Sequence, residues 1–167
     1  MNRGRHKFRV LVADDFAEHG IMLACAMRQT QTLQMIHTVT TRREAFRYLV
    51  GEGSYSNRSR FPFPEVVITE LGMPCLETVK LLAAMGMDGF KRPLRIVLTC
   101  SPLPEHRRQA GRMGMDAYFT MPESFHGLVD IAREIERMLL RTHEPPRLKA
   151  PAAKRAVRPR HSGATLG

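Results

Sequence analysis

The sequence predicts an α/β fold in which a parallel β-sheet is covered by helices on both faces. Two observations support this fold class. Short apolar segments alternate with longer helical segments five times, and the apolar segments are nearly continuous runs of Val, Ile and Leu. Such runs are typical of strands buried on both faces, as in parallel sheets between two helical layers. The chain has 167 residues, about one domain with some length to spare.

The apolar segments define five expected strands. The first begins with Phe8, continues with an apolar run and stops at an acidic pair, Asp14 and Asp15. In parallel sheets of this type the ligand site lies beyond the carboxyl ends of the strands, so the residues after each run are the candidates for function. The expected strands are residues 7–13, 33–39, 66–68, 96–98 and 117–120.

Five helices are expected between and after these strands. Apolar residues recur at helical spacing most clearly from residue 125 to 141, which includes Leu128, Ala132 and Ile135. Asp14 or Asp15 is available to cap the first helix. Residues 51–64 are expected to be a long polar loop, because they hold Gly, Ser, Asn and two prolines. The expected helices are residues 16–29, 41–50, 76–85, 104–113 and 125–141.

The net charge of +10 belongs to the two ends of the chain. Residues 1–9 hold four basic residues, and residues 141–167 hold seven basic residues and one acidic residue, which leaves 15 of each sign between them. We therefore expect a basic arm over 1–6, a folded domain over 7–141 and a basic, Pro-rich, disordered tail over 142–167. The tail is either a solvated segment or a polyanion-binding arm. Because it holds no aromatic residue, nucleic acid would be bound only through phosphates and only by the tails.

Several classes of protein are excluded or disfavoured by composition. No run of 18 apolar residues exists, so no membrane span is expected, and no apolar signal core follows the basic start. The three cysteines have no metal-binding spacing and are expected to be free thiols in the cytoplasm, with Cys100 a small buried residue. The seven histidines show no ligand spacing, so neither zinc binding nor catalysis through them is expected.

Four motifs at the strand ends resemble, in order and spacing, those of a CheY-like receiver domain, the input domain of bacterial two-component response regulators. The resemblance covers residues 7–141 and implies a flavodoxin-like, doubly wound sheet in the order 2-1-3-4-5. The long loop is similar to that of stand-alone receivers, including some that pair with phytochrome-type kinases. The motifs are VLVADD (10–15), PEVVITELGMP (64–74), IVLT (96–99) and GMDAYFTMP (114–122).

The resemblance also implies roles for individual residues. In the family, an aspartate after the third strand accepts a phosphoryl group from a histidine kinase, with Mg²⁺ neutralising the transferring oxygens. Asp14, Asp15, residue 70 and the carbonyl of Gly72 match the Mg²⁺ ligands. Thr99 and Tyr118 match the hydroxyl and the aromatic ring that report phosphorylation.

Two positions depart from the family pattern. Glu70 stands at the phosphoacceptor position, and Met121 precedes Pro122 where the family has a Lys-Pro pair. A glutamate carboxylate lies one carbon–carbon bond, about 1.5 Å, farther out than that of aspartate. Because in-line transfer depends on placement, and because the cation beside the phosphoryl group is missing, ordinary activation by phosphorylation is not expected.

The loss of the lysine leaves the acidic residues without a cation. Two carboxylates about 4 Å apart repel by roughly 4 kcal/mol at an effective dielectric constant of about 20. Retained but weakened Mg²⁺ binding by Asp14, Asp15 and Glu70 is the favoured solution. The alternatives are a protonated carboxyl group, or Glu70 turned towards a basic residue, for which the nearest in sequence are Arg95, Arg107 and Arg108.

Three functions remain open. The first is an atypical single-domain response regulator, not an enzyme, that acts by protein–protein contact, with a histidine kinase or another signalling protein as partner. It could also form a homodimer through the fourth helix, fifth strand and fifth helix. The second is a conventional Mg²⁺-dependent phosphoryl acceptor. The third is a polyanion binder that uses the basic ends.

Overall fold

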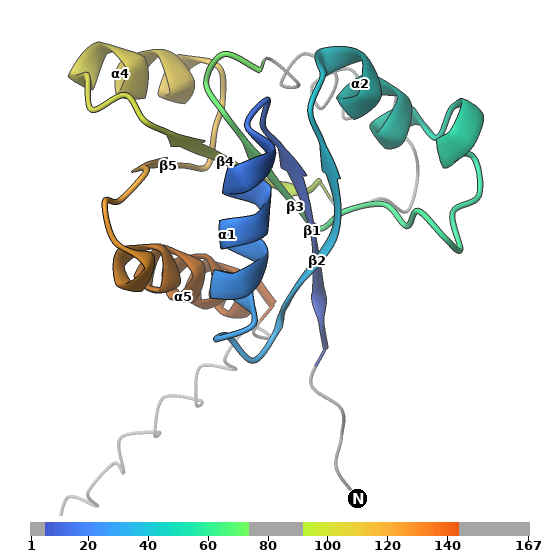
Figure 1. Ribbon diagram of the computed structural model, residues 1–167, viewed down its shortest axis with the longest axis horizontal. Coiled ribbons are helices and arrows are strands. Elements are labelled where there is room, and N and C mark those ends of the chain that lie inside the picture. Colours follow the sequence, from blue (N-terminus) through green and yellow to red (C-terminus); the bar gives the residue numbers. More distant parts are fainter. Residues whose placement is uncertain (1–5, 74–91, 144–167) are drawn as a thin grey trace, which may run out of the picture.

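The computed structural model describes residues 6–73 and 92–143, and these form one five-stranded sheet with helices packed on it (Figure 1). The strand order is β2-β1-β3-β4-β5, and all four neighbouring pairs are parallel. This confirms the expected doubly wound topology. The strands are β1 (Phe8–Ala13), β2 (Leu33–Val39), β3 (Val66–Thr69), β4 (Leu94–Thr99) and β5 (Ala117–Thr120).

Four α-helices and one short 3₁₀ helix lie within the described residues. Their order along the chain agrees with the expected alternation, and the expected helix over 76–85 lies outside the described residues. The helices are α1 (Ala17–Met27), α2 (Arg42–Val50), η1 (Gly53–Tyr55), α4 (Pro104–Arg112) and α5 (Phe125–His143).

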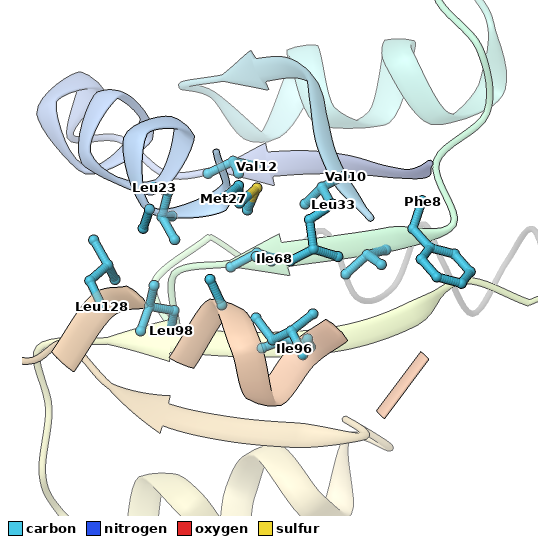
Figure 2. Close-up of a cluster of buried hydrophobic side chains, with 14 of the residues drawn as sticks. Phe8, Val10, Val12, Leu23, Met27, Leu33, Ile68, Ile96, Leu98 and Leu128 are labelled. Carbon is cyan, nitrogen blue, oxygen red and sulfur yellow. The ribbon is translucent and has the colours of Figure 1, made fainter. Parts of the chain in front are cut away.

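Buried apolar side chains fill both faces of the sheet. On one face α1 packs against α5, and side chains such as Leu23 and Leu128 from these helices meet Val12, Ile68 and Leu98 of the strands (Figure 2). On the opposite face α2 and α4 contact alternate residues of the same strands. The central strands are therefore buried on both sides, which is why their sequences are apolar runs without alternation.

Two helix ends differ from the sequence-based expectation. The N-cap of α1 is Phe16, and no side chain caps this helix. The carboxylate of Asp14 instead accepts the N–H of Phe16 (2.8 Å), in the turn that precedes the helix. At the other end of the domain, α5 continues to His143, so the last two helical residues were expected in the tail.

The segment between α2 and β3 is ordered by aromatic packing. The rings of His37, Tyr48, Tyr55 and Phe61 form one cluster, with centroids 5.1–6.1 Å apart. Tyr48 is fully buried and donates its hydroxyl to the Pro62 carbonyl (3.0 Å), and burial raises its pKa to about 12. Burial also lowers the pKa of His37.

Arg58 fastens the same segment to the end of α2. Its guanidinium group donates to the carbonyls of Tyr48 and Leu49, both at 2.7 Å, and to that of Phe61 at 3.3 Å. Helix α2 ends at Val50, and its C-cap is Gly51, whose φ of 75° is left-handed and so favours glycine. Residues 51–64, expected as a polar loop, thus pack on the domain through partly buried aromatic rings and through the Arg58 guanidinium group at the end of α2.

The helices of residues 6–73 and 92–143 are those of a globular fold. None of those described is long and apolar enough to span a membrane.

Candidate functional site

The carboxyl ends of β1, β3 and β4 bring the candidate residues to one edge of the sheet. The Glu70 N–H donates to the Ala13 carbonyl (3.0 Å), which continues the pairing of β1 and β3 by one residue. The Met121 N–H donates to the Thr99 carbonyl (2.7 Å) and extends the pairing of β4 and β5 in the same way. These backbone bonds place Asp14, Glu70, Thr99 and Met121 at the same edge, where such folds bind their ligands.

Glu70 is held by two hydrogen bonds to its carboxylate. The hydroxyl of Thr99 donates to Oε1 (2.6 Å), and the N–H of Gly72 donates to Oε2. The turn itself is closed by the Thr69 hydroxyl, which donates to the Met73 carbonyl (2.7 Å). A Cβ atom on Gly72 would lie 2.9 Å from Glu70 Oε2, so glycine at 72 leaves room for the carboxylate. The Glu70 side chain is thereby fixed between β3 and β4.

Asp14 is nearly buried, and protein groups contact both of its carboxylate oxygens. Oδ1 accepts from the Phe16 N–H (2.8 Å), and Oδ2 lies 2.8 Å from Nδ1 of His19. Only 6% of Asp14 is exposed, whereas Asp15 faces solvent. The two members of the acidic pair therefore differ: one is an internal acceptor and the other is free to meet a partner or an ion.

His19 is a site residue that the sequence reasoning missed. The spacing of the histidines relative to one another gives no sign of this role. The partner of His19 is a carboxylate, that of Asp14, five residues earlier in the chain. The signal that could have found it is its place in the first turn of the helix that follows the acidic pair. From there a side chain can reach back over the end of β1.

Tyr118 lies inside the fold with its hydroxyl bonded. It is 8% exposed, and its hydroxyl donates to the Ser101 carbonyl (2.8 Å). The guanidinium group of Arg107 lies over the ring, 4.8 Å from its centroid, and donates to the Tyr118 carbonyl (3.1 Å). Ser101 is in turn held by His106, whose Nδ1 is 2.6 Å from its hydroxyl oxygen. The Tyr118 ring is thus held in place by α4 and by the loop between β4 and α4.

Met121 contributes packing at the position where the family has lysine. Its side chain is partly buried and lies against the apolar core under α5. The neighbouring Pro122 approaches α5 closely, since a Cβ atom on Gly127 would lie 2.8 Å from the Pro122 Cβ. The tight contact fixes the start of α5 beside the site, and position 121 adds no positive charge there.

One alternative left open for Glu70 and one expectation, for Cys100, are wrong. Glu70 does not turn towards a basic residue. Within the described parts of the chain, Arg95 pairs with Asp116 (3.3 Å), Arg107 contacts Tyr118, and Arg108 lies 3.9 Å from Glu105. Those arginines have partners on α4, on β5 or at Asp116 just before β5, and the Glu70 carboxylate is satisfied by Thr99 and Gly72. Cys100 is exposed rather than buried, because it follows the last residue of β4 and leaves the covered sheet.

The acidic residues do not form a metal-binding group as they are placed. Within residues 6–73 and 92–143, no three His, Cys, Asp or Glu side chains are arranged to hold an ion. Both carboxylate oxygens of Asp14 and of Glu70 instead accept hydrogen bonds from separate sets of protein groups. The role of Asp14, Asp15, Glu70 and Gly72 as Mg²⁺ ligands therefore stays a prediction from the resemblance.

A surface hollow of about 430 Å³ lies away from this edge. Its lining includes Glu65, Arg92 and Asp116, which precede β3, β4 and β5 and so lie at the amino ends of the strands. The hollow therefore has no part in the arrangement around Glu70.

Solved structures of response regulators share this fold. Response regulator RPA3017, from red-light signalling in R. palustris, is 24% identical with a TM-score of 0.65, over 84% of this chain and 99% of that one. The Mn²⁺-bound form of response regulator Rcp1 is 19% identical with a TM-score of 0.60, over 87% and 99%. CheY6 from R. sphaeroides, bound to the P1 domain of CheA3, is 14% identical with a TM-score of 0.59, over 81% and 98%. No protein-family model and no curated protein sequence matches the chain.

The comparisons establish the fold of this chain. The chain has the receiver-domain fold of two-component response regulators, and the residues that match the family's motifs gather at the expected edge. The proteins with which it shares this fold are signalling proteins. One of them is described in complex with the P1 domain of CheA3, and another is described in its Mn²⁺-bound form.

Proposed function

We propose that this chain is an atypical single-domain response regulator that acts by protein–protein contact, with its switch residues engaged in the absence of a phosphoryl group. The observation that carries the proposal is the hydrogen bond from the Thr99 hydroxyl to Glu70 Oε1, at 2.6 Å. In the family that this chain resembles, the hydroxyl reports the phosphorylated aspartate. Here it is bonded to a carboxylate that the chain itself supplies.

The length of glutamate supports this reading. Its carboxylate extends about 1.5 Å farther from the backbone than that of aspartate. Its negative charge therefore lies closer to where a phosphoryl group on aspartate would be. The oxygen that accepts the Thr99 hydrogen bond therefore supplies negative charge that a kinase would otherwise add with a phosphoryl group.

The state of Tyr118 supports the same conclusion independently. Its ring is buried under Arg107, and its hydroxyl is bonded to Ser101 two residues beyond Thr99. Thr99 and Tyr118, the two residues that the resemblance assigns to the switch, therefore each donate a hydrogen bond through the side-chain hydroxyl. We therefore expect the surface formed by β4, α4 and β5 to have the same conformation with and without a phosphoryl group.

The absence of a lysine before Pro122 also supports a pocket that does not bind a phosphoryl group. Met121 packs into the apolar core and leaves the position without an ammonium group. A phosphoryl group there would lack the cation that stabilises its charge, and it would meet the charge of Glu70. We therefore assign the signal to binding of a partner, either a histidine kinase or another signalling protein, and not to turnover of a substrate.

The partner surface that we propose is the face made by α4, β5 and α5. Tyr118 lies on β5 and so belongs to an element of this face. The same face would join two copies in a homodimer. Light scattering across a range of concentrations distinguishes a dimer from a monomer that needs a different partner.

A phosphorylation assay tests the proposal. The full chain is incubated with a radiolabelled acyl phosphate, with and without Mg²⁺, beside the Glu70→Gln variant. We expect no stoichiometric label on either protein. Mg²⁺-dependent label on the unmodified chain that is lost in Glu70→Gln would show that Glu70 still accepts phosphate, and the chain would then be a conventional receiver.

A further inference from the structure

His19 contacts Asp14, one of the residues that match the Mg²⁺ ligands of the family that this chain resembles. Oδ2 of Asp14 is 2.8 Å from His19 Nδ1, and the exposed fractions of the two side chains are 6% and 18%. An ionised carboxylate only accepts hydrogen bonds, so the imidazole supplies the hydrogen. It does so both as the neutral Nδ1–H tautomer and as the imidazolium ion, so the contact does not depend on the charge of the ring.

The local fold holds His19 in this orientation. Its backbone N–H donates to the Phe16 carbonyl (3.1 Å), and its ring packs against the Phe16 ring, with centroids 5.3 Å apart. The next residue is Gly20, where a Cβ atom would come within 3.0 Å of the Thr38 side chain on β2. The first turn of α1 therefore sits close to the sheet, and the imidazole is directed back over the end of β1.

The donors around both inward carboxylates are all protein groups. Phe16 N–H and His19 contact Asp14, and Thr99 and Gly72 N–H contact Glu70. Mg²⁺ demands near-ideal octahedral geometry at about 2.0–2.1 Å from its oxygen ligands. A carboxylate oxygen that accepts one hydrogen bond keeps a second lone pair, so what these side chains lack is a common arrangement around one ion. In the described ranges no three ligand side chains are arranged for an ion.

We propose that His19 is a positioning residue that takes the place of a divalent cation at Asp14, so that the pocket keeps its structure without Mg²⁺. The inference deepens the proposed function, on which it rests, because a switch that is permanently engaged needs no ion to recruit a phosphoryl group. Asp15, which faces solvent, takes no part in this arrangement.

A metal titration of the full chain tests this inference. The amide signals of Phe16 and Gly72 are followed by ¹H–¹⁵N NMR, because these two N–H groups donate to Asp14 and Glu70. MgCl₂ is added through the millimolar range, and trace MnCl₂ is used separately as a paramagnetic probe. The unmodified chain should show no saturable shift at either amide and no selective broadening by Mn²⁺.

Three variants separate positioning by His19 from a merely structural role. In His19→Ala the Asp14 carboxylate loses a donor, and the Phe16 amide should gain a saturable Mg²⁺ shift. In His19→Asn the amide nitrogen can replace Nδ1, and the response should return to that of the unmodified chain. His126→Ala changes an exposed histidine on α5 and should have no effect on the titration.

Two results would overturn the inference. One is a saturable Mg²⁺ shift at Phe16 and Gly72 in the unmodified chain. The other is a His19→Ala variant that responds to Mg²⁺ no more than the unmodified chain. Should His19→Ala fail to fold, the unmodified chain and His19→Asn still decide, because Mg²⁺ binding by either contradicts the inference. Mg²⁺ binding without phosphorylation would remove this inference and leave the proposed function intact, since only the label assay bears on the latter.

Discussion

A carboxylate that is partly buried needs donors, and the identity of those donors determines what the site can do. Glu70 obtains them from Thr99 and Gly72, and Asp14 from Phe16 and His19. Each pair combines a backbone N–H that is close in sequence with one side chain. That side chain comes from the neighbouring strand β4 for Glu70 and from the first turn of helix α1 for Asp14. The two carboxylates are satisfied separately, which removes the need for one cation shared between them.

Removing the Thr99 hydroxyl tests the bond on which the proposed function depends. Thr99→Val keeps the shape of the side chain but leaves Glu70 Oε1 without its donor. Hydrogen bonds to charged groups contribute about 1.5–3 kcal/mol, and we expect a loss of this size in the free energy of unfolding measured in urea. Thr120→Val, at the position paired with Thr99 on β5, is the control and should cost much less. Equal losses in the two variants would argue against a special role for the Thr99 bond.

A substitution at Gly72 tests the same carboxylate from its other side. The φ angle of Gly72 is not positive, so alanine fits the backbone, but its Cβ would lie 2.9 Å from Glu70 Oε2. Gly72→Ala should displace the carboxylate and lower the free energy of unfolding by about 1 kcal/mol, the typical worth of a hydrogen bond. Gly111→Ala is the matched control. Nothing lies within 4 Å of a Cβ there, so the helix should gain about 0.5–1 kcal/mol. A Gly72→Ala variant as stable as the unmodified chain would contradict the packing described around Glu70.

Sequence reasoning located most of the site residues but not their partners. Asp14, Glu70, Thr99 and Met121 were found because parallel strands end at one edge, and that rule depends only on the strand assignments. The Thr99–Glu70 bond could not be derived, because it depends on a side-chain rotamer across two strands. His19 was missed because its partner is a carboxylate rather than another histidine.

At the scale of elements, the segment between α2 and β3 is where local composition gave the least guidance. Its Gly, Ser, Asn and Pro residues indicate a polar loop, and these residues do turn the chain there. The order comes from Tyr55 and Phe61, which pack on Tyr48 and His37. Aromatic residues scattered through a polar segment have no periodicity, so their common cluster is visible only in three dimensions.

Truncating Arg58 tests how firmly this segment is attached. The guanidinium group satisfies three carbonyls at the end of α2 and in the loop. Arg58→Ala should lower the free energy of unfolding by about 2 kcal/mol, since bonds to a charged group are lost and partly buried carbonyls are left unpaired. Arg43→Ala, on an exposed position of α2, should change it by less than about 0.5 kcal/mol. A loss below that limit in Arg58→Ala would mean that the aromatic cluster alone holds the segment.

At the scale of the whole molecule, the charge separates into a neutral body and basic ends. The region 10–140 holds equal numbers of basic and acidic residues, and the excess of ten positive charges lies outside it. Any attraction to polyanions would therefore come from the ends and would be screened by salt within about 10 Å at 0.1 M ionic strength. The folded domain and the ends are thus expected to have separate binding properties.

A salt titration with two chain lengths tests this division. The full chain and a chain that ends at His143 are titrated with a short DNA duplex in a mobility-shift assay. Binding by the full chain should weaken steeply as salt rises, and the shorter chain should bind much more weakly. Undiminished binding by the shorter chain would assign the interaction to the folded domain.

The fold itself followed from sequence with little ambiguity. The apolar runs that form β1, β3 and β4 are buried on both faces, and that double burial both makes them continuous and requires a parallel sheet. The strand order rests on the resemblance to receiver domains, since pattern alone does not distinguish the permutations of such a sheet. The helix expected at 76–85 lies outside the described residues and stays a prediction.

The most direct test of the account is the environment of Tyr118 with and without a phosphoryl mimic. The chain has only three tyrosines, so a ¹³C-labelled tyrosine spectrum is simple, and Tyr118→Phe assigns the relevant signal. If Thr99 is already bonded to Glu70 and Tyr118 to Ser101, adding Mg²⁺ and beryllofluoride should leave the Tyr118 ring signal unchanged. A stoichiometric shift of that signal would show that the switch still waits for a phosphoryl group.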